Sequence, residues 1–529
     1  MQQSACHFDT GRPHAEREAF AAPDDRDPCS FYSKRPVGQV RRRWGHRYNG
    51  CVDNKNGSAG WALPFLAGVA AGTAGVALLR ALERKPGIDP RLFRGLLGKG
   101  GIAPVVVVPG IMGSCLLRPD GTAVWLNLRN ALGHYNLSLP FTLPLSECRD
   151  DLVPGPLLGT EAVMPRLFGF TEYADLLEIL ESGGFRAASH KDETRPAYHV
   201  FSYDWRRDLV DSARRLHETL ESLAEAHGDP DARFNLIGHS MGGLVARYYL
   251  RYGAAEPDEG AKVTWAGARR IRSLILVAVP NGGAVHALEA LLYGNRVGLS
   301  YTTLAAEVIA RMPSVYELLP PATAPALLDH KLEPLAADLH DVSTWERFGW
   351  GPFAPAVVRR LSGSDGDIQP HRRFLEAALL RARAFHGALA RPPETPCPVR
   401  VTLLGGDCLP TLARAVVPDK EGLPPRFEPW NRTETEAMFE AGDGRLTRAS
   451  VLAQHLPGAA DDDEAGCGIP EVAHMMFGSA DHHGIYREPT FQSIILRQLL
   501  RPGRPSRGVV AEAVNDGVLP LPEPPLSGI

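Results

Sequence analysis

Residues 234–250 are FNLIGHSMGGLVARYYL, in which the apolar run 234–238 leads directly into a Gly-x-Ser-x-Gly pattern centred on Ser240. The apolar run is typical of a buried strand, and residues 242–250 are compatible with a helix. In such a strand–turn–helix element the serine lies on a sharp turn that lifts its hydroxyl clear of the sheet. The flanking glycines have no Cβ, so the strand and the helix can approach each other closely. This stretch therefore predicts an accessible serine between a central strand and a helix.

Strands and helices alternate along the rest of the chain. Strands of four to eight residues between amphipathic helices are typical of a parallel sheet covered on both faces. We therefore expect an α/β fold with a mostly parallel sheet and helices on both faces. Apolar runs predict strands at residues 104–108, 199–203, 271–279 and 399–405, and helical spacing predicts helices at 211–227 and 491–499.

A serine hydroxyl is a weak nucleophile unless a neighbouring base takes its proton, and a tetrahedral intermediate needs hydrogen-bond donors. The backbone N–H of Met241, directly after the serine, is one expected donor. The second is the backbone N–H of Ile111, in the loop PGIMG at residues 109–113 that follows the early strand. Its glycines would let that N–H turn toward Ser240. A tight turn without a catalytic part is the alternative for this loop.

Composition excludes some partners. Lys and Arg number 57 against 61 Asp and Glu, a formal net charge of −4, so there is no basic excess and we expect no nucleic-acid partner. None of the eight cysteines forms a C-x-x-C pair, which argues against a structural zinc site. We expect no metal and no cofactor.

Five segments together carry a resemblance to a known family. In order and approximate spacing they resemble the lecithin:cholesterol acyltransferase family, which includes lysosomal phospholipase and bacterial lipase-like relatives. The resemblance covers roughly residues 101–500. It implies an α/β-hydrolase fold with a cap or lid insertion, and a triad of serine, an aspartate in a GDG segment and a late histidine. The segments are PVVVVPGIMGSCL (104–116), FSYDWRRD (201–208), FNLIGHSMGG (234–243), VAVPNGGAV (277–285) and GDG (442–444).

The family's aspartate corresponds to Asp443, although the family usually continues GDGTVP and this chain has GDGRLT. Asp407 is the alternative acid, because it follows the predicted strand 399–405, where many other α/β-hydrolases carry theirs. For the base, the segment DHHGIYREP favours His482, and His483 is the alternative. Two further histidines, His455 and His474, fit the family pattern less well.

The resemblance also predicts a cap around residues 115–170. Trp125 resembles a family position near the lid, so we expect it either to contact substrate or to be buried in the core. The Asp-Trp-Arg segment at 204–206 is expected to form a buried ion pair under a tryptophan and to fix the loop beside the active site. Cys115 and Cys148 flank the cap and are the pair to test for a disulfide.

The remaining segments set the domain organisation. We expect a poorly ordered extension at 1–56, an apolar segment and linker at 57–100, the hydrolase domain at 101–500 and a Pro-rich tail at 501–529. Residues 56–79 carry no charge, and about 20 such residues can span a bilayer. A membrane anchor, an export signal and a docked helix all stay open for this stretch, so membrane-associated, exported and cytoplasmic locations stay open too.

The functional hypothesis is serine-dependent acyl transfer from a lipid or other hydrophobic ester, by an O-acyltransferase, a lipase or a phospholipase. The acyl-enzyme would form on Ser240, and contact with a membrane surface stays open. The alternative is a catalytically inactive, membrane-tethered binding or scaffold protein that keeps the fold. An intact set of serine, aspartate and histidine argues against that alternative.

Overall fold

The computed structural model describes residues 102–125, 137–158, 172–189, 195–258, 260–295, 304–362, 367–420, 422–456 and 466–500. The chain divides into two units, Met1–Lys85 and Pro86–Ile529, and every described residue lies in the second. The predicted extension (1–56), apolar segment and linker (57–100) and tail (501–529) therefore lie outside the described residues. Among the helices that are described, none is long and apolar enough to cross a membrane.

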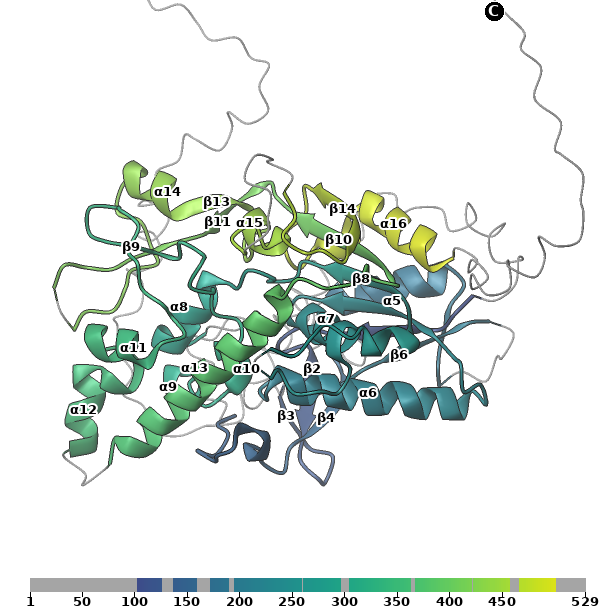
Figure 1. Cartoon of the computed structure of the whole chain (residues 1–529), viewed down its shortest axis with the longest axis horizontal. Helices are drawn as coiled ribbons and strands as arrows, with labels where there is room; N and C mark the ends of the chain where they lie inside the picture. The colour runs from purple at the N-terminus through teal and green to yellow at the C-terminus, as the bar shows by residue number, and fades with distance from the viewer. Residues whose placement is uncertain are drawn as a thin grey trace, which may run out of the picture. The chain divides into compact units, whose positions relative to one another are not determined.

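Seven strands form the central sheet in the order β14-β10-β8-β7-β1-β6-β5, and every neighbouring pair is parallel (Figure 1). In the register of β1 with β7, Val108 lies opposite Gly238. The loops that leave these two strands therefore start level with each other at one edge of the sheet. The strands are β1 (Val105–Val108), β5 (Arg186–Ala187), β6 (Ala197–Val200), β7 (Phe234–His239), β8 (Ile271–Val277), β10 (Arg400–Gly406) and β14 (Val472–Gly478).

Helices cover both faces of this sheet. Side chains alternate along a strand, so Val106 and Leu236 face one core while Val107 and Ile237 face the other. The first core is shared with α6 (Leu209–Ala226), α7 (Met241–Tyr252) and α13 (Gln369–Ala390). The second is shared with α5 (Glu172–Ser182) and α16 (Pro489–Leu499). The predicted fold class, a mostly parallel sheet between two helical layers in the α/β-hydrolase manner, is confirmed.

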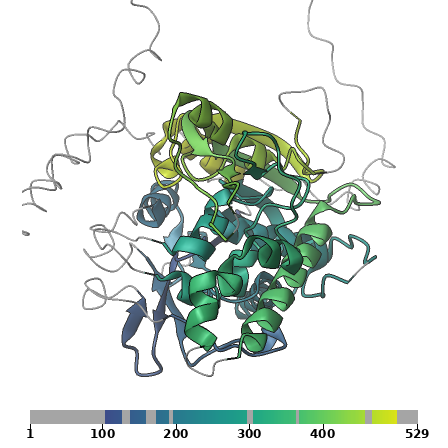
Figure 2. The ribbon, with the colours of Figure 1, turned by 90° about the vertical axis from the view of Figure 1, so that its left-hand side faces the viewer.

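The cap contains a small antiparallel sheet of three strands, β3-β2-β4. Its strands are β2 (Ser114–Leu117), β3 (Ala123–Trp125) and β4 (Val153–Leu157). A second insertion, which was not predicted, lies between β8 and α13 and appears on the left of Figure 1 and at the front of Figure 2. Its helices are α8 (Val285–Tyr293), α9 (Ala306–Ile309), α10 (Pro313–Tyr316), α11 (Val342–Phe348) and α12 (Pro355–Ser362).

Shorter elements complete the described part of the chain. β11 pairs with β13 in antiparallel orientation, whereas β9 and β12 pair in parallel. All of these strands except β9 follow β10 in the chain, and the loop with Asp443 comes directly after β13. The shorter elements are β9 (Leu327–Leu328), β11 (Leu409–Leu412), β12 (Ala415–Val416), α14 (Arg432–Met438), β13 (Phe439–Gly442) and α15 (Arg448–Leu452), with 3-10 turns at Leu145–Glu147, Ala266–Arg269, Gly351–Phe353 and Ile485–Arg487.

Candidate active site

Ser240 lies at the turn between β7 and α7, where its backbone has φ 51° and ψ −129°. A positive φ at a residue other than glycine is strained and persists only where the surroundings enforce it. Gly242 allows the main chain after Ser240 to pack closely against the loop after β1, because a Cβ on it would lie 2.2 Å from the Pro109 carbonyl oxygen. Ser240 itself is only partly buried, so its hydroxyl stays accessible.

Asp443, His482 and Ser240 form one continuous line of hydrogen-bonding contacts. His482 Nδ1 lies 2.8 Å from Asp443 Oδ2, and His482 Nε2 lies 3.2 Å from Ser240 Oγ. The backbone N–H of His482 also donates to the Asp443 carbonyl at 3.0 Å. In this arrangement an imidazole can take the proton of a serine hydroxyl while a carboxylate holds its other nitrogen.

The loop that carries Asp443, here called the acid loop (residues 443–447), begins directly after β13. Asp443 Oδ1 accepts the backbone N–H groups of Arg445 at 2.9 Å and Leu446 at 2.7 Å. Burial raises the pKa of this carboxyl group, but His482 and the two N–H donors outweigh burial, so the pKa lies below its usual value. Asp443 is therefore an ionised carboxylate beside the imidazole at neutral pH.

The rival acid and base have other partners. Asp407 forms an ion pair with Arg448 at 2.9 Å. His483 is exposed and lies 3.4 Å from Glu172, on α5. His474 lies on an exposed part of β14. Of the candidates taken from the sequence, the structure thus brings Asp443 and His482 to Ser240.

The loop of residues 109–113, here called the oxyanion loop after its predicted role, lies directly against the serine turn. A Cβ on Gly110 would lie 2.9 Å from Ser240 Cβ, so only glycine allows this approach. The loop closes with a hydrogen bond from the Gly113 N–H to the Gly110 carbonyl at 3.1 Å. Met112 has a φ of 63°, a second strained position in the site. Ile111 and Met241, whose N–H groups are the predicted donors, thus belong to two adjacent turns.

Buried aromatic side chains hold the oxyanion loop from behind. Trp125 is fully buried, and its indole N–H donates to the Met112 carbonyl at 3.1 Å. The Tyr203 hydroxyl donates to the Pro109 carbonyl at 2.8 Å. Trp205, whose ring lies edge-on to that of Trp125, donates to the Ser114 carbonyl at 3.1 Å. Of the two places considered for Trp125, the structure gives it the core position, under the loop.

Arg206 ties the same segment to the cap. Its guanidinium is buried and pairs with Asp204 at 2.8 Å and with Asp150 of the cap at 2.7 Å. Burial lowers the pKa of this guanidinium, but the two carboxylates outweigh burial and raise it. The Asp-Trp-Arg segment therefore supports both the oxyanion loop and the cap.

No disulfide joins Cys115 to Cys148. The Cys148 thiol is buried and donates to the Pro140 carbonyl at 3.1 Å. Burial raises the pKa of this thiol to about 11, so it is protonated at neutral pH. The pair is thus two thiols packed in the cap.

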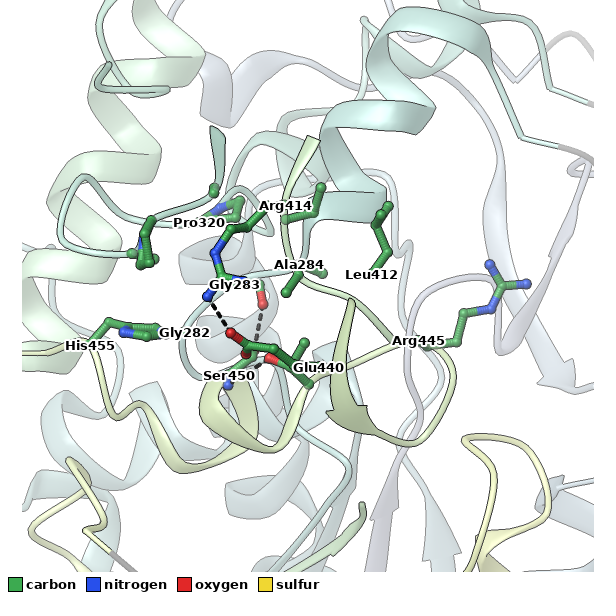
Figure 3. A pocket seen from close by; sticks show the side chains of 16 residues that line it. Gly282, Gly283, Ala284, Pro320, Leu412, Arg414, Glu440, Arg445, Ser450 and His455 are labelled. Carbon is green, nitrogen blue, oxygen red and sulfur yellow. Dashed lines mark hydrogen bonds and ion pairs between the residues drawn. The ribbon is translucent and has the colours of Figure 1, made fainter. Parts of the chain in front are cut away.

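The described residues form a small pocket next to the acid loop and a larger groove at the cap. A pocket of about 30 Å³ is lined by the turn at Gly283 and by Ser450, whose hydroxyl donates to the Gly283 carbonyl, and it has room for a water molecule or two. Arg414 and Glu440 form an ion pair on its wall (Figure 3). A larger open groove of about 510 Å³ lies between the cap and α9, lined by Ser138, Leu139, Pro140, Arg149, Asp150, Glu307 and Arg311. Within the described ranges, no group of three His, Cys, Asp or Glu side chains could hold a metal ion.

The fold is that of an α/β-hydrolase, and a family match supports the acyl-ester hydrolase or acyltransferase kind. Residues 166–343 match the model of the family described as lecithin:cholesterol acyltransferase, which confirms the resemblance that the motifs predicted. A search of curated protein sequences finds no significant match.

Solved structures similar to this chain include a lipase and a phospholipase. A chain from the crystal structure of the Tle4-Tli4 complex has a TM-score of 0.46 and 17% identity, covering 76% of this chain and 99% of its own length. Lipase BlEst2 of Bacillus licheniformis, in mature form, has a TM-score of 0.31 and 11% identity, covering 79% and 97%. Phospholipase PlaB from Legionella pneumophila has a TM-score of 0.31 and 12% identity, covering 78% and 63%.

Proposed function

We propose that this protein transfers the acyl group of a lipid ester through an acyl-enzyme on Ser240. The observation that carries the proposal is the unbroken contact line from Asp443 through His482 to the Ser240 hydroxyl. His482 is the general base and then the general acid, and Asp443 orients it and balances its charge. The family match over residues 166–343 supports a lipid ester as the acyl donor.

The reaction has two steps, in which Ser240 is first acylated and the acyl group then passes to water or to a second alcohol. Ser240 Oγ bonds to the ester carbonyl carbon as His482 Nε2 takes the hydroxyl proton. The N–H groups of Ile111 and Met241 stabilise the oxyanion that develops. The tetrahedral intermediate then expels the alcohol, which leaves with the proton from His482. Water or a second alcohol enters by the reverse steps, and a free acid or a new ester leaves.

The cap suits a substrate that arrives from a lipid phase. Two aliphatic side chains of this region, Leu143 and Val153, are exposed by 45% and 47%. We expect these side chains to contact the lipid surface that presents the ester. Binding to phosphatidylcholine vesicles, compared between wild type and a Leu143→Ser, Val153→Ser double variant, tests this.

The test of the main proposal is a substrate assay with Ser240→Ala. We expect turnover of a chromogenic acyl ester to fall by up to about 10⁶-fold while circular dichroism stays unchanged. Reaction of wild type, but not of the variant, with an active-serine phosphonate separates an enzyme from an inactive scaffold. A Ser240→Ala protein that keeps a tenth of the wild-type rate would remove Ser240 as the nucleophile.

The products of the reaction show whether the acyl acceptor is water or an alcohol. Purified protein is given a phospholipid with and without a hydrophobic alcohol, and the products are identified by mass spectrometry. Free fatty acid in both reactions identifies a hydrolase, whereas a new ester that appears only with the alcohol identifies an acyltransferase.

A further inference from the structure

The two predicted oxyanion donors come from different turns, and something must fix the distance between them. Ile111 belongs to the loop after β1, whereas Met241 opens α7 after β7. A displacement of about 1 Å in such a site can lower a rate by about 10²-fold. A side chain that touches both turns would hold this distance.

Tyr173, in the first turn of α5, is such a side chain. It is 1% exposed, and its hydroxyl accepts the backbone N–H of Gly110 at 2.7 Å. The same hydroxyl lies 2.9 Å from Nδ1 of His239. Gly110 directly precedes Ile111, and His239 directly precedes Ser240. The tyrosine oxygen therefore links the oxyanion loop to the serine turn.

We propose that Tyr173 is a positioning residue that holds the two oxyanion donors at their working separation through its bonds to Gly110 and His239. This inference rests on the proposed function, since it concerns the rate of the same acyl transfer. By turning the Gly110 N–H toward α5, Tyr173 fixes the plane of the Pro109–Gly110 peptide, which is one peptide before the one that carries the Ile111 N–H. By binding the His239 ring, it ties that peptide to the turn that carries Ser240.

The protonation states of the pair suit this link. Burial raises the pKa of Tyr173 well above its usual value, so the side chain keeps its proton. Burial, with His482 and His483 nearby, lowers the pKa of His239 well below its usual value, so the imidazole is neutral. A phenol that accepts the Gly110 N–H can then donate its own proton to a neutral Nδ1.

Two other buried aromatic side chains bind the oxyanion loop. Tyr203 and Trp125 donate to carbonyl groups of the oxyanion loop. Among the side chains of the described residues, Tyr173 is the one whose recorded hydrogen bonds reach both the loop and the residue before the serine. Tyr203 and Trp125 therefore shape the loop, and Tyr173 relates it to the serine turn.

The test compares Tyr173→Phe with wild type and with Tyr198→Phe as a matched control. Tyr198 donates its hydroxyl to Glu181 at 2.8 Å, away from both turns. On a short-chain ester we expect Tyr173→Phe to lower kcat by about 30-fold with little change in KM, since only positioning in the transition state is lost. The Ki of a trifluoromethyl ketone, whose adduct carries an oxyanion, should rise by the same factor. Tyr198→Phe should leave both constants within about 2-fold.

The outcomes separate this inference from the proposed function. If wild type is not inhibited by the ketone, or Ser240→Ala remains active, the proposed function fails first. If both checks hold and folded Tyr173→Phe keeps its kcat, or loses kcat without any change in Ki, the positioning role of Tyr173 is wrong.

A second pair of variants covers the case in which Tyr173→Phe does not fold. His239→Leu removes the acceptor for the Tyr173 hydroxyl, whereas His239→Asn can present an oxygen in place of Nδ1. We expect the leucine variant to lose about 10-fold in kcat and the asparagine variant to recover part of that loss. Equal rates in the two variants would overturn the link.

Discussion

The two sides of the candidate site are held in different ways. The serine side is fixed by close packing of backbone, with Gly110 and Gly242 against neighbouring main chain and a strained φ at Ser240. The acid side also has closely packed glycines, at Gly406 and Gly442, but it adds hydrogen bonds to a charge, since the Asp443 carboxylate binds two backbone N–H groups and His482. Packing should therefore make the serine side sensitive to added volume, and charge should make the acid side sensitive to pH.

The largest expected effect distinguishes the two acids and the two histidines. Asp443→Ala and His482→Ala should each lose about 10⁴- to 10⁶-fold in turnover, because the three side chains act as one unit. Asp407→Ala and His483→Ala are the matched controls and should lose at most about 10-fold, since their partners are Arg448 and Glu172. The measurement is the initial rate on a chromogenic ester.

Two results would change the assignment. Collapse in Asp407→Ala with a rate retained in Asp443→Ala would move the acid to the end of β10 and undo the comparison between the two sides. The same exchange between His483 and His482 would move the base by one residue and leave the mechanism unchanged.

A smaller effect should follow from added volume on the serine side. In Gly242→Ala the new Cβ would lie 2.2 Å from the Pro109 carbonyl oxygen, so main chain must move. We expect a loss of about 1 to 3 kcal/mol in the free energy of unfolding and a fall of about 10²-fold in kcat as the oxyanion loop shifts.

Gly387→Ala is the control, because it lies within α13 and a Cβ there meets nothing within 4 Å. This change should stabilise the protein by up to about 1 kcal/mol and leave the rate unchanged. If both alanine variants behave alike, close packing does not hold the serine side.

The smallest effect concerns the pH dependence of stability on the acid side. The pKa of Asp443 is lower in the folded chain than in the unfolded chain, so its ionised form stabilises the fold above the unfolded value. That contribution should vanish as the pH falls through the folded value. The difference in unfolding free energy between wild type and Asp443→Asn should therefore be largest near neutral pH and shrink below about pH 4.

Denaturant titrations at several pH values measure this difference. Gly242→Ala serves again as a reference, since its loss comes from sterics and should vary little over the same range. A wild-type to Asp443→Asn difference that stays constant with pH would mean that charge does not hold the acid loop.

Much of the fold could be predicted because buried parallel strands carry continuous apolar runs. The strands β1, β7, β8 and β10 all have that signature. β14 was missed because it is an edge strand whose residues 473–476 are exposed, so it shows no buried run. The strand predicted at 199–203 ends at Val200. The residues after it leave the sheet, and Tyr203 turns to bind Pro109.

The second insertion was missed for a different reason. Its helices α9 and α10 have only four residues each, too few to show a helical period. Their positions depend on tertiary packing, such as the bond from the Ser314 hydroxyl to the Trp205 carbonyl at 2.7 Å.

The candidate site could be predicted where chemistry fixes the residue type. Ser240, Asp443 and His482 follow from a glycine pattern and from family segments, and the structure brings the three together. The supports behind them could not be predicted in the same way. Tyr173 is one more buried aromatic on an amphipathic helix, and nothing in its neighbours in sequence indicates Gly110, 63 residues away. Tyr203 could be singled out because it belongs to the Tyr-Asp-Trp-Arg segment, but its hydrogen bond to the Pro109 carbonyl could not be predicted from the sequence.

The segment from Tyr203 to Arg206 has a fixed length as a consequence of its contacts. Tyr203 and Trp205 bind the main chain at Pro109 and Ser114, while Asp204 pairs with Arg206, which in turn pairs with Asp150 of the cap. The aromatic and the charged side chains alternate along the segment, so neighbouring residues make contacts with different parts of the structure. Deleting one residue would exchange the two kinds of side chain and press a carboxylate against carbonyl oxygens. We therefore expect an insertion or a deletion in this segment to disturb both the oxyanion loop and the cap, whereas a single substitution removes one contact.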